Sequence, residues 1–162
     1  MKLVWGTPRQ ADIDGFLAVL GEIGERHGSV IQAIDARLVA GEDHLRRAAV
    51  LARRAREHGE PIADDPAMEL LCYVAGTRQI ERALDFGIET ASDPVVVVVT
   101  EGDEAAAAAA VRDRGVTPGD RPAPATDRLD NWFEITAAER RATTAPREAL
   151  VVERVALLAV DR

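Results

Sequence analysis

Side chains that could do chemistry are present in this chain, but their spacing matches no familiar catalytic or metal-binding pattern. His27, His44 and His58 lie too far apart for a metal site, and Cys72 is the only cysteine. No Gly-Lys-Ser/Thr sequence follows Gly102, so a phosphate-binding loop is missing as well. We therefore expect no catalytic residue, no metal and no cofactor, and a protein that is not an enzyme.

The stretch ELLCYVAGTRQIERALDFGI, residues 69–88, is rich in apolar residues yet is broken near its middle by Gly76 and the polar Thr77, Arg78 and Gln79. One interpretation is a plain turn between two helices, in which the glycine takes a positive φ. The other is a ligand site, because a backbone without Cβ permits close approach. The donors that follow would then lie at a helix N-terminus, which attracts anions. The residues alone do not decide between the two.

A second candidate surface is the polar face of a helix predicted over residues 43–58. Its inner face is apolar, and its other side carries Arg46, Arg47, Arg53 and Arg54. Such a face is most often simply solvated, and its functional interpretation is a surface that contacts phosphates.

The elements that must position these side chains are a mixture of strands and helices. The pattern predicts strands at 2–5, 30–36 and 95–99, and helices at 13–27, 43–58, 67–75, 80–87, from 104, from 136 and from 146. We expect an α/β (α+β) fold with one domain over residues 1–162. Its small mixed sheet should have three to four strands, with helices packed on it in two layers. Residues 117–130 contain three prolines and predict a surface loop.

Composition and charge indicate the kind of cell and the compartment in which we expect the protein. The net charge is −8, the acidic excess lies in residues 61–120, and Lys2 is the only lysine. An acidic, lysine-poor surface is typical of a GC-rich genome and of salt-adapted cells. The longest aliphatic run is far shorter than the ~20 residues that a membrane span needs. The start of the chain shows no cleavable signal, so we expect a cytoplasmic protein.

Three segments together resemble one family: VIQAIDARLVAGEDHLRRA, MELLCYVAGTRQIERALDFGI and the C-terminal VVERVALLAV. The chain is similar to the smallest conserved core subunit of the KEOPS complex, the PRPK-binding protein (TPRKB) family, in its archaeal type. The most specific positions are Glu69-Leu70-Leu71, Ala75-Gly76, Gln79-Ile80, Ala83-Leu84 and Gly87-Ile88. The proline-rich segment at 117–130 departs from the family.

The resemblance implies a non-catalytic subunit that binds the kinase-like ATPase of KEOPS and grips the single-stranded CCA end of tRNA. The tRNA is thereby recruited for threonylcarbamoyl-adenosine modification. It also gives the Gly76 break a purpose as a notch for unstacked nucleotides. We expect the tRNA-binding residues to be Gly76, Thr77, Arg78, Gln79, Ile80, Arg82, Arg46, Arg47, Arg53 and Arg54.

The C-terminal segment 149–160 leaves almost no polar face, so a helix there must be buried in the core or against a partner. We consider Val151, Val155 and Leu158 candidates for docking the kinase-like subunit, with a plain core helix as an equal alternative. Two other functions stay open: a kinase-binding scaffold without RNA affinity, and a small-molecule-binding domain that uses the notch. We expect Gly76→Glu to abolish tRNA binding with little change in melting temperature.

Overall fold

A computed structural model describes residues 1–160 of this chain. Within them the chain forms two compact units. Residues 1–36 and 85–122 form one, which we call the sheet unit, and residues 37–84 with the chain from 123 onward form the helical unit. No helix in the described residues is both long and apolar enough to cross a membrane.

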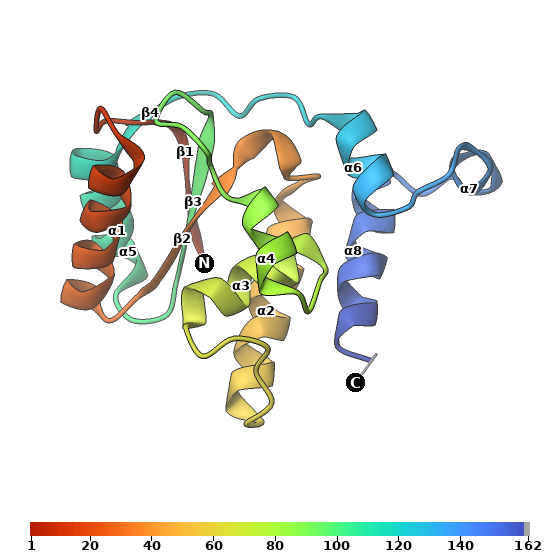
Figure 1. The fold of residues 1–162 in the computed structure, drawn as a ribbon, viewed down its shortest axis with the longest axis horizontal. Helices are drawn as coiled ribbons and strands as arrows, with labels where there is room; N and C mark the ends of the chain where they lie inside the picture. The colour runs from red at the N-terminus through yellow and green to blue at the C-terminus, as the bar shows by residue number, and fades with distance from the viewer. Residues whose placement is uncertain (161–162) are drawn as a thin grey trace. The chain divides into compact units, whose positions relative to one another are not determined.

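The sheet unit contains four strands and the helices α1 and α5, joined to the last strand by a π-helical turn at Val111–Gly115. Both helices run along the strands in Figure 1. The elements are β1 (Lys2–Pro8), α1 (Ile13–His27), β2 (Val30–Asp35), β3 (Val95–Thr100), α5 (Glu104–Ala110) and β4 (Val116–Pro118).

The strand order is β2-β3-β1-β4, and every neighbouring pair is antiparallel. Val97 lies opposite Val4 on one side and opposite Ala33 on the other. Strands that run in the same direction, β1 with β2 and β3 with β4, are each joined through a helix and are separated by one strand. This interleaving of two β-α-β units is the ferredoxin-like arrangement. The sheet predicted to be mixed is therefore antiparallel, because its parallel strands are never neighbours.

The core of the sheet unit forms between the sheet and its two helices. Alternate residues of β3, Val95, Val97 and Val99, pack there, and α1 and α5 both contact the strands. Val96 and Val98 must face the other side because side chains alternate along a strand. They are fully buried as well. Both faces of β3 are therefore covered, which agrees with its unbroken run of valines, since a strand with one solvated face usually alternates apolar and polar residues.

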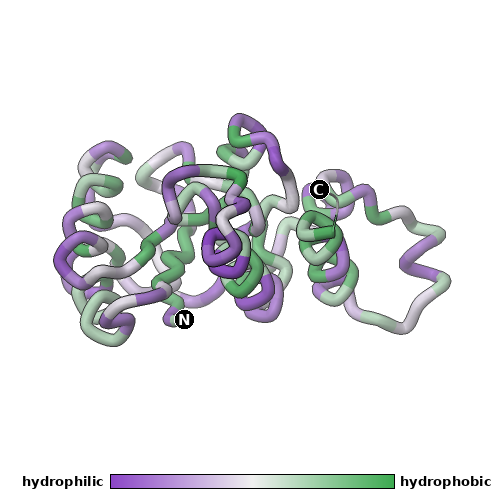
Figure 2. The backbone as a smooth tube through the Cα atoms, turned by 90° about the horizontal axis from the view of Figure 1, so that it is seen from below, coloured by the Kyte–Doolittle hydropathy of each residue, from purple (hydrophilic) through white to green (hydrophobic). Residues whose placement is uncertain are grey.

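The helical unit is built around α2, α3 and α8, which pack against one another, and α4 packs on α3. Helix α8, which lies beside the C-terminus in Figure 2, carries its charged residues in two pairs, Arg147-Glu148 and Glu153-Arg154, and is apolar elsewhere. The elements are α2 (Glu42–Glu57), α3 (Pro66–Ala75), α4 (Ile80–Ala83), α6 (Thr126–Trp132), α7 (Ala137–Ala142) and α8 (Arg147–Leu158), with 3-10 turns at Ala36–Leu38 and Leu84–Phe86.

The N-terminus of α2 is capped by a residue from α8. Gly41 at the N-cap position provides no side chain. The Glu148 carboxylate instead accepts the N–H of Asp43 (2.8 Å) and the N–H of His44 (3.3 Å). A Cβ on Gly41 would collide with the same carboxylate. A negative charge at this helix end is favourable, so the contact ties α2 to a helix about a hundred residues further along the chain.

The sequence predictions of an α/β fold, of a sheet with three to four strands and of helices over 13–27, 43–58 and 67–75 are confirmed within one or two residues. The loop predicted at 117–130 is wrong at both ends. Its first residues form β4 and pair with β1, and its last residues belong to α6. The C-terminal segment is helical to Leu158. One domain over residues 1–162 stays a prediction.

Candidate functional site

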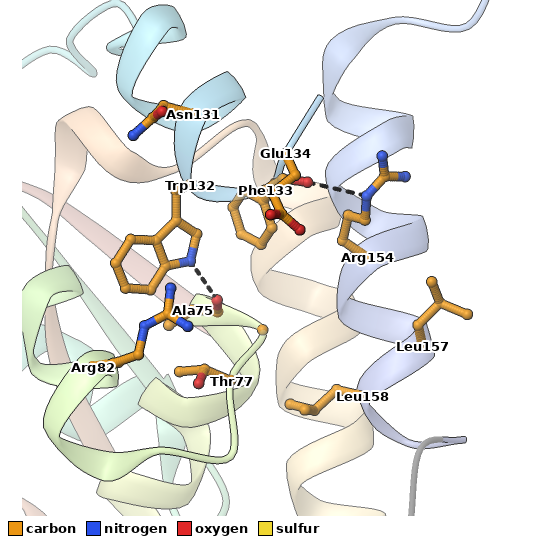
Figure 3. A pocket seen from close by; sticks show the side chains of 11 residues that line it. Ala75, Thr77, Arg82, Asn131, Trp132, Phe133, Glu134, Arg154, Leu157 and Leu158 are labelled. Carbon is orange, nitrogen blue, oxygen red and sulfur yellow. Dashed lines mark hydrogen bonds between the residues drawn. The ribbon is translucent and has the colours of Figure 1, made fainter. Parts of the chain in front are cut away.

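A hollow of about 460 Å³ opens in the helical unit where α3, α6 and α8 end. Figure 3 shows its walls, and we call it the Gly76 pocket. It is lined by Ala75, Gly76, Thr77, Arg82, Asn131, Trp132, Phe133, Glu134, Arg154, Leu157 and Leu158.

Helix α3 ends at the pocket in a left-handed turn. Gly76 has φ 63°, its N–H donates to the Tyr73 carbonyl (3.2 Å), and the Thr77 N–H donates to the Cys72 carbonyl (3.1 Å). These two bonds form the Schellman motif, in which glycine is preferred because a side chain is strained at positive φ. A Cβ on Gly76 would lie 3.0 Å from Cε1 of Phe133. The predicted positive φ is confirmed.

This geometry contradicts the expectation that Gly76→Glu leaves the melting temperature nearly unchanged. Any side chain at this position adds a left-handed strain of about 1–2 kcal/mol and presses on Phe133. Gly76 is therefore required by the turn itself, and a variant at Gly76 cannot separate binding from folding. Other lining residues must be used for that purpose.

Helix α6 ends at the same pocket in the same way, but without glycine. Glu134 has φ 53°, and the Ile135 N–H donates to the Asp130 carbonyl (2.8 Å), the long bond of a Schellman motif. A left-handed conformation costs a residue with a Cβ about 1 kcal/mol relative to the ordinary helical region. The chain thus places a carboxylate at a position where glycine would be more stable.

At the C-terminal end of each of the three helices, a side chain donates a hydrogen bond to a backbone carbonyl. Two of these bonds are drawn in Figure 3. Trp132 Nε1 donates to the Ala75 carbonyl (2.7 Å), Arg154 Nε to the Phe133 carbonyl (3.1 Å) and an Arg78 guanidinium N–H to the Leu158 carbonyl (3.1 Å).

The pocket is therefore built from helix C-termini, which carry partial negative charge. The sequence suggested instead that donors at a helix N-terminus would attract anions. That helix, α4, spans only Ile80–Ala83, and a single turn of helix sums too few peptide dipoles to bind an anion at its end. Positive charge at the pocket comes from arginine side chains.

Two of those arginines are held in defined positions. The Arg82 guanidinium lies over the Trp132 ring, 4.8 Å from its centroid. Arg154 forms a bidentate pair with Glu139 of α7, at 2.7 and 2.8 Å. Because Arg154 is already paired, Arg82 is the lining cation better placed to act on a ligand. Together Arg82 and Trp132 provide a flat surface of the kind on which nucleobases and other planar groups stack.

The structure brings together only part of the predicted RNA site. Gly76, Thr77 and Arg82 line the pocket. Thr77 is buried, and its hydroxyl oxygen accepts the Gln79 N–H (3.1 Å). Arg78 caps α8. Gln79 and Ile80 are exposed at the start of α4 and do not line the pocket.

The arginines of α2 lie elsewhere. Arg46 and Arg47 line a second hollow of about 610 Å³ between α2 and α8, which shares no lining residue with the Gly76 pocket. Its apolar surface comes from Val50, Ala149 and Val152, and we call it the α2–α8 hollow. Arg53 and Arg54 are exposed and line neither.

The predicted docking residues of α8 turn out to be mostly core. Val151 and Val155 are fully buried and Leu158 is 8% exposed, so these side chains stabilise the helical unit itself. The exposed apolar residue of α8 is Leu157, at 51%. A partner that docks on α8 must use residues other than the two buried valines.

Sequence reasoning missed the wall contributed by α6. Asn131, Trp132, Phe133 and Glu134 follow the proline-rich segment that we interpreted as a loop. One signal was available: adjacent Trp and Phe are conspicuous in a chain with only 4% aromatic residues. No local pattern, however, shows that these residues face Gly76.

Burial shifts the pKa of three groups within α2 and α3. Burial lowers the pKa of His44 from 6.5 to about 4, although its bond to the Val74 carbonyl opposes this. Burial also raises the pKa of the Cys72 thiol to about 11, with a smaller contribution from Glu69. The Glu69 pKa is raised by burial, against the N–H groups of Ala63 and Ile62 that its carboxylate accepts. None of the three lines the Gly76 pocket.

His44 should make the free energy of unfolding depend on pH. The Ala40 N–H donates to Nδ1 (3.1 Å), so Nε2 carries the proton and donates to the Val74 carbonyl (2.8 Å). Because the folded pKa is depressed, the unfolded state binds the proton first. Stability is then lost as pH falls below 6.5 towards 4. We expect a loss of about 2 kcal/mol between pH 7.5 and 5.

Urea titrations at several pH values would measure this slope. Glu69 has a raised pKa, so its own contribution to stability increases as pH falls and acts in the opposite direction. His44→Gln keeps a donor for Val74 but does not titrate, and it should remove the His44 part of the slope. An NMR titration that shows His44 protonated above pH 6 would contradict the assignment.

The pocket can bind and orient a ligand, and its described residues offer little else in the way of chemistry. Residues 1–160 contain no group of three or more His, Cys, Asp or Glu side chains that could hold a metal ion. What the pocket offers is a stacking surface, two arginines and a carboxylate around an open volume. Such a combination suits a planar group with both a phosphate and a polar edge.

The fold and the pocket define a mixed α/β protein whose helical unit carries a ligand-sized hollow at three helix ends. The chain belongs to the CGI-121 family, described as kinase binding proteins, because its sequence matches that family over residues 22–159. No curated protein matches the chain.

Proposed function

We propose that this chain is a subunit of the KEOPS complex, of archaeal type and cytoplasmic. It binds the kinase-like ATPase subunit and recruits tRNA by its terminal CCA for threonylcarbamoyl-adenosine modification. Membership of the CGI-121 family supports the kinase partner. The acidic composition with a single lysine supports the archaeal type. The RNA part rests on one observation, the Gly76 pocket.

The Gly76 pocket has the features that single-stranded RNA requires. Unstacked bases are usually bound by stacking on aromatic rings or guanidinium planes, and Arg82 over Trp132 offers both. Gly76 and Thr77, at the turn that ends α3, contribute to the pocket wall beside this pair. A volume of about 460 Å³ is in the range of small-ligand pockets, so the pocket would take a terminal nucleotide rather than a duplex.

Net charge limits how the RNA is held. With a formal charge of −8, the protein as a whole repels phosphates. Attraction must then come from a few local arginines, and affinity should depend only weakly on salt. The same acidity favours the alternative of a kinase-binding scaffold without RNA affinity, so binding of tRNA needs a direct test.

For the kinase we propose the α2–α8 hollow as the docking surface. Val50 is 42% exposed there, and Ala149 and Val152 line the hollow together with Arg46 and Arg47. Apolar residues accompanied by charged ones are usual at a protein interface. The α2–α8 hollow and the Gly76 pocket share no lining residue, so substitutions can test the two sites separately.

We also propose that the chain is not itself an enzyme. The only cysteine has a raised pKa, and His44 is buried and engaged by backbone groups. A general base or nucleophile needs a pKa suited to its task and access to substrate. Neither side chain has both.

Removal of the CCA end should abolish most binding of tRNA to this chain. We expect a loss of at least about tenfold, because stacking alone contributes roughly 1–3 kcal/mol per base. Electrophoretic mobility shifts with one tRNA, prepared with and without its last three nucleotides, would measure it. Restoring the CCA enzymatically should restore the affinity. Equal binding of the two forms would favour the scaffold without an RNA site.

A further inference from the structure

The pocket contains one acceptor whose presence the turn does not explain. Glu134 occupies the left-handed position that ends α6, where glycine is preferred. Within residues 1–160 its carboxylate forms no hydrogen bond or ion pair, and the residue lines the Gly76 pocket. Strained residues at binding sites are commonly kept for what their side chains do.

One backbone acceptor at each of the three helix ends is already in use. The last carbonyls of α3, α6 and α8 each accept a hydrogen bond from a side chain. A ligand that brings N–H donors into the pocket would find two side-chain acceptors there, the Glu134 carboxylate and the Asn131 amide oxygen, and only Glu134 carries a charge. The partial negative charge of the helix ends also favours donors here over a second anion.

We propose that Glu134 selects bases with an exocyclic amino group, accepting the N4 amine of cytosine or the N6 amine of adenine. This inference rests on the proposed recruitment of the CCA end. A carboxylate is a good acceptor for the cytosine amine, and every base of a CCA end carries such a donor. Uracil presents a carbonyl oxygen in place of the amine, so it would set an acceptor against the carboxylate. Glu134 would therefore discriminate against uracil and against base analogues that lack the exocyclic amino group.

The stacking surface and the Glu134 carboxylate have different roles in recognition. The Arg82–Trp132 pair accepts any base, because every base has a flat face. This pair contributes affinity but does not discriminate between bases. Glu134, on the neighbouring turn, would distinguish the edge of the stacked base. The terminal nucleotide of the strand is the natural occupant, because the pocket is too small for a folded RNA.

Short oligonucleotides can test this directly. Fluorescence anisotropy would compare ACCA with strands in which each cytosine in turn is uracil, or the last adenine is purine without its amine. We expect the unaltered protein to bind ACCA about tenfold more tightly than at least one of these strands. In Glu134→Gln that ratio should fall below about threefold, because an amide can also offer a donor to uracil.

Glu134→Gly is the matched control, since glycine suits the left-handed turn. It should melt no lower than the unaltered chain while losing the same discrimination. If both variants keep the full preference for ACCA, the assignment of Glu134 is overturned, although recruitment of the CCA end stands. If the unaltered chain binds none of the strands, the proposed RNA function fails, and this inference fails with it.

Discussion

Val155→Glu should unfold the helical unit, whereas Val50→Glu should leave it folded. Val155 is fully buried on α8, so the new carboxylate would have no access to water and no partner. An uncompensated buried charge costs roughly 3–5 kcal/mol, a large part of the total stability of a small protein. Val50 is 42% exposed on α2, and a charge there should change stability by no more than about 0.5 kcal/mol. Thermal melts followed by circular dichroism would compare the two variants.

The same pair tests where the kinase docks. Val50→Glu should fold normally and lose at least about tenfold in affinity for the kinase-like subunit, because it puts a charge among the apolar lining residues of the α2–α8 hollow. Leu157→Glu, in the Gly76 pocket, should bind the kinase normally and weaken tRNA binding. Titration calorimetry with the purified kinase-like subunit would measure the kinase affinity of both variants. Normal kinase binding by Val50→Glu would remove the α2–α8 hollow as the docking surface.

Arg82→Ala should lower the affinity for a CCA-ended RNA about tenfold. Arg82 lies over Trp132 in the Gly76 pocket, so its removal deletes one layer of the stacking surface and the local positive charge. The substitution is on the outside of the one-turn helix α4, so the melting temperature should change little. Anisotropy with a labelled RNA end would measure the change in affinity.

The chain provides a closely matched control for this variant. Its only other tryptophan, Trp5, also has an arginine over its ring: Arg121 in the sheet unit, 5.2 Å from the centroid. Arg121→Ala removes the same charge and the same kind of contact, but not at the pocket. Its affinity for the RNA end should stay within about twofold of the unaltered chain. Equal losses in the two variants would mean that RNA responds only to net charge.

Local patterns were enough to predict most of the secondary structure. The unbroken run of valines at 95–99 is typical of a strand such as β3, glycine and proline follow the ends of α1 and α2, and the apolar run at 67–75 lies in α3. The pairing of strands could not be predicted, because it is decided by contacts between distant residues such as Val4 and Val97. The mixed sheet was therefore expected in error.

The candidate site was predicted on one side only. Gly76 was identified from its own neighbours, because a glycine that ends a helix leaves a local signal. The only local signal of the α6 wall was the adjacent pair Trp132 and Phe133, which does not show what these residues face. Its helix is only seven residues long, and Asp130 is held by Arg147 at 2.7 Å and by Arg140 at 3.4 Å. These ion pairs, like the bond from Trp132 to α3, exist only in the folded chain.

The division of the chain into two interleaved units has a consequence for its synthesis. The sheet unit needs residues 85–122 as well as 1–36, and the helical unit needs the chain beyond 123. A growing chain therefore has no complete unit to fold while its first half leaves the ribosome. β2 must wait for β3, which begins some sixty residues later. The capping carboxylate of α2 is made about a hundred residues after the helix end that it caps. Early helices would be held only by local contacts until then, so nascent chains stalled before α8 should be the most vulnerable to proteases and to aggregation.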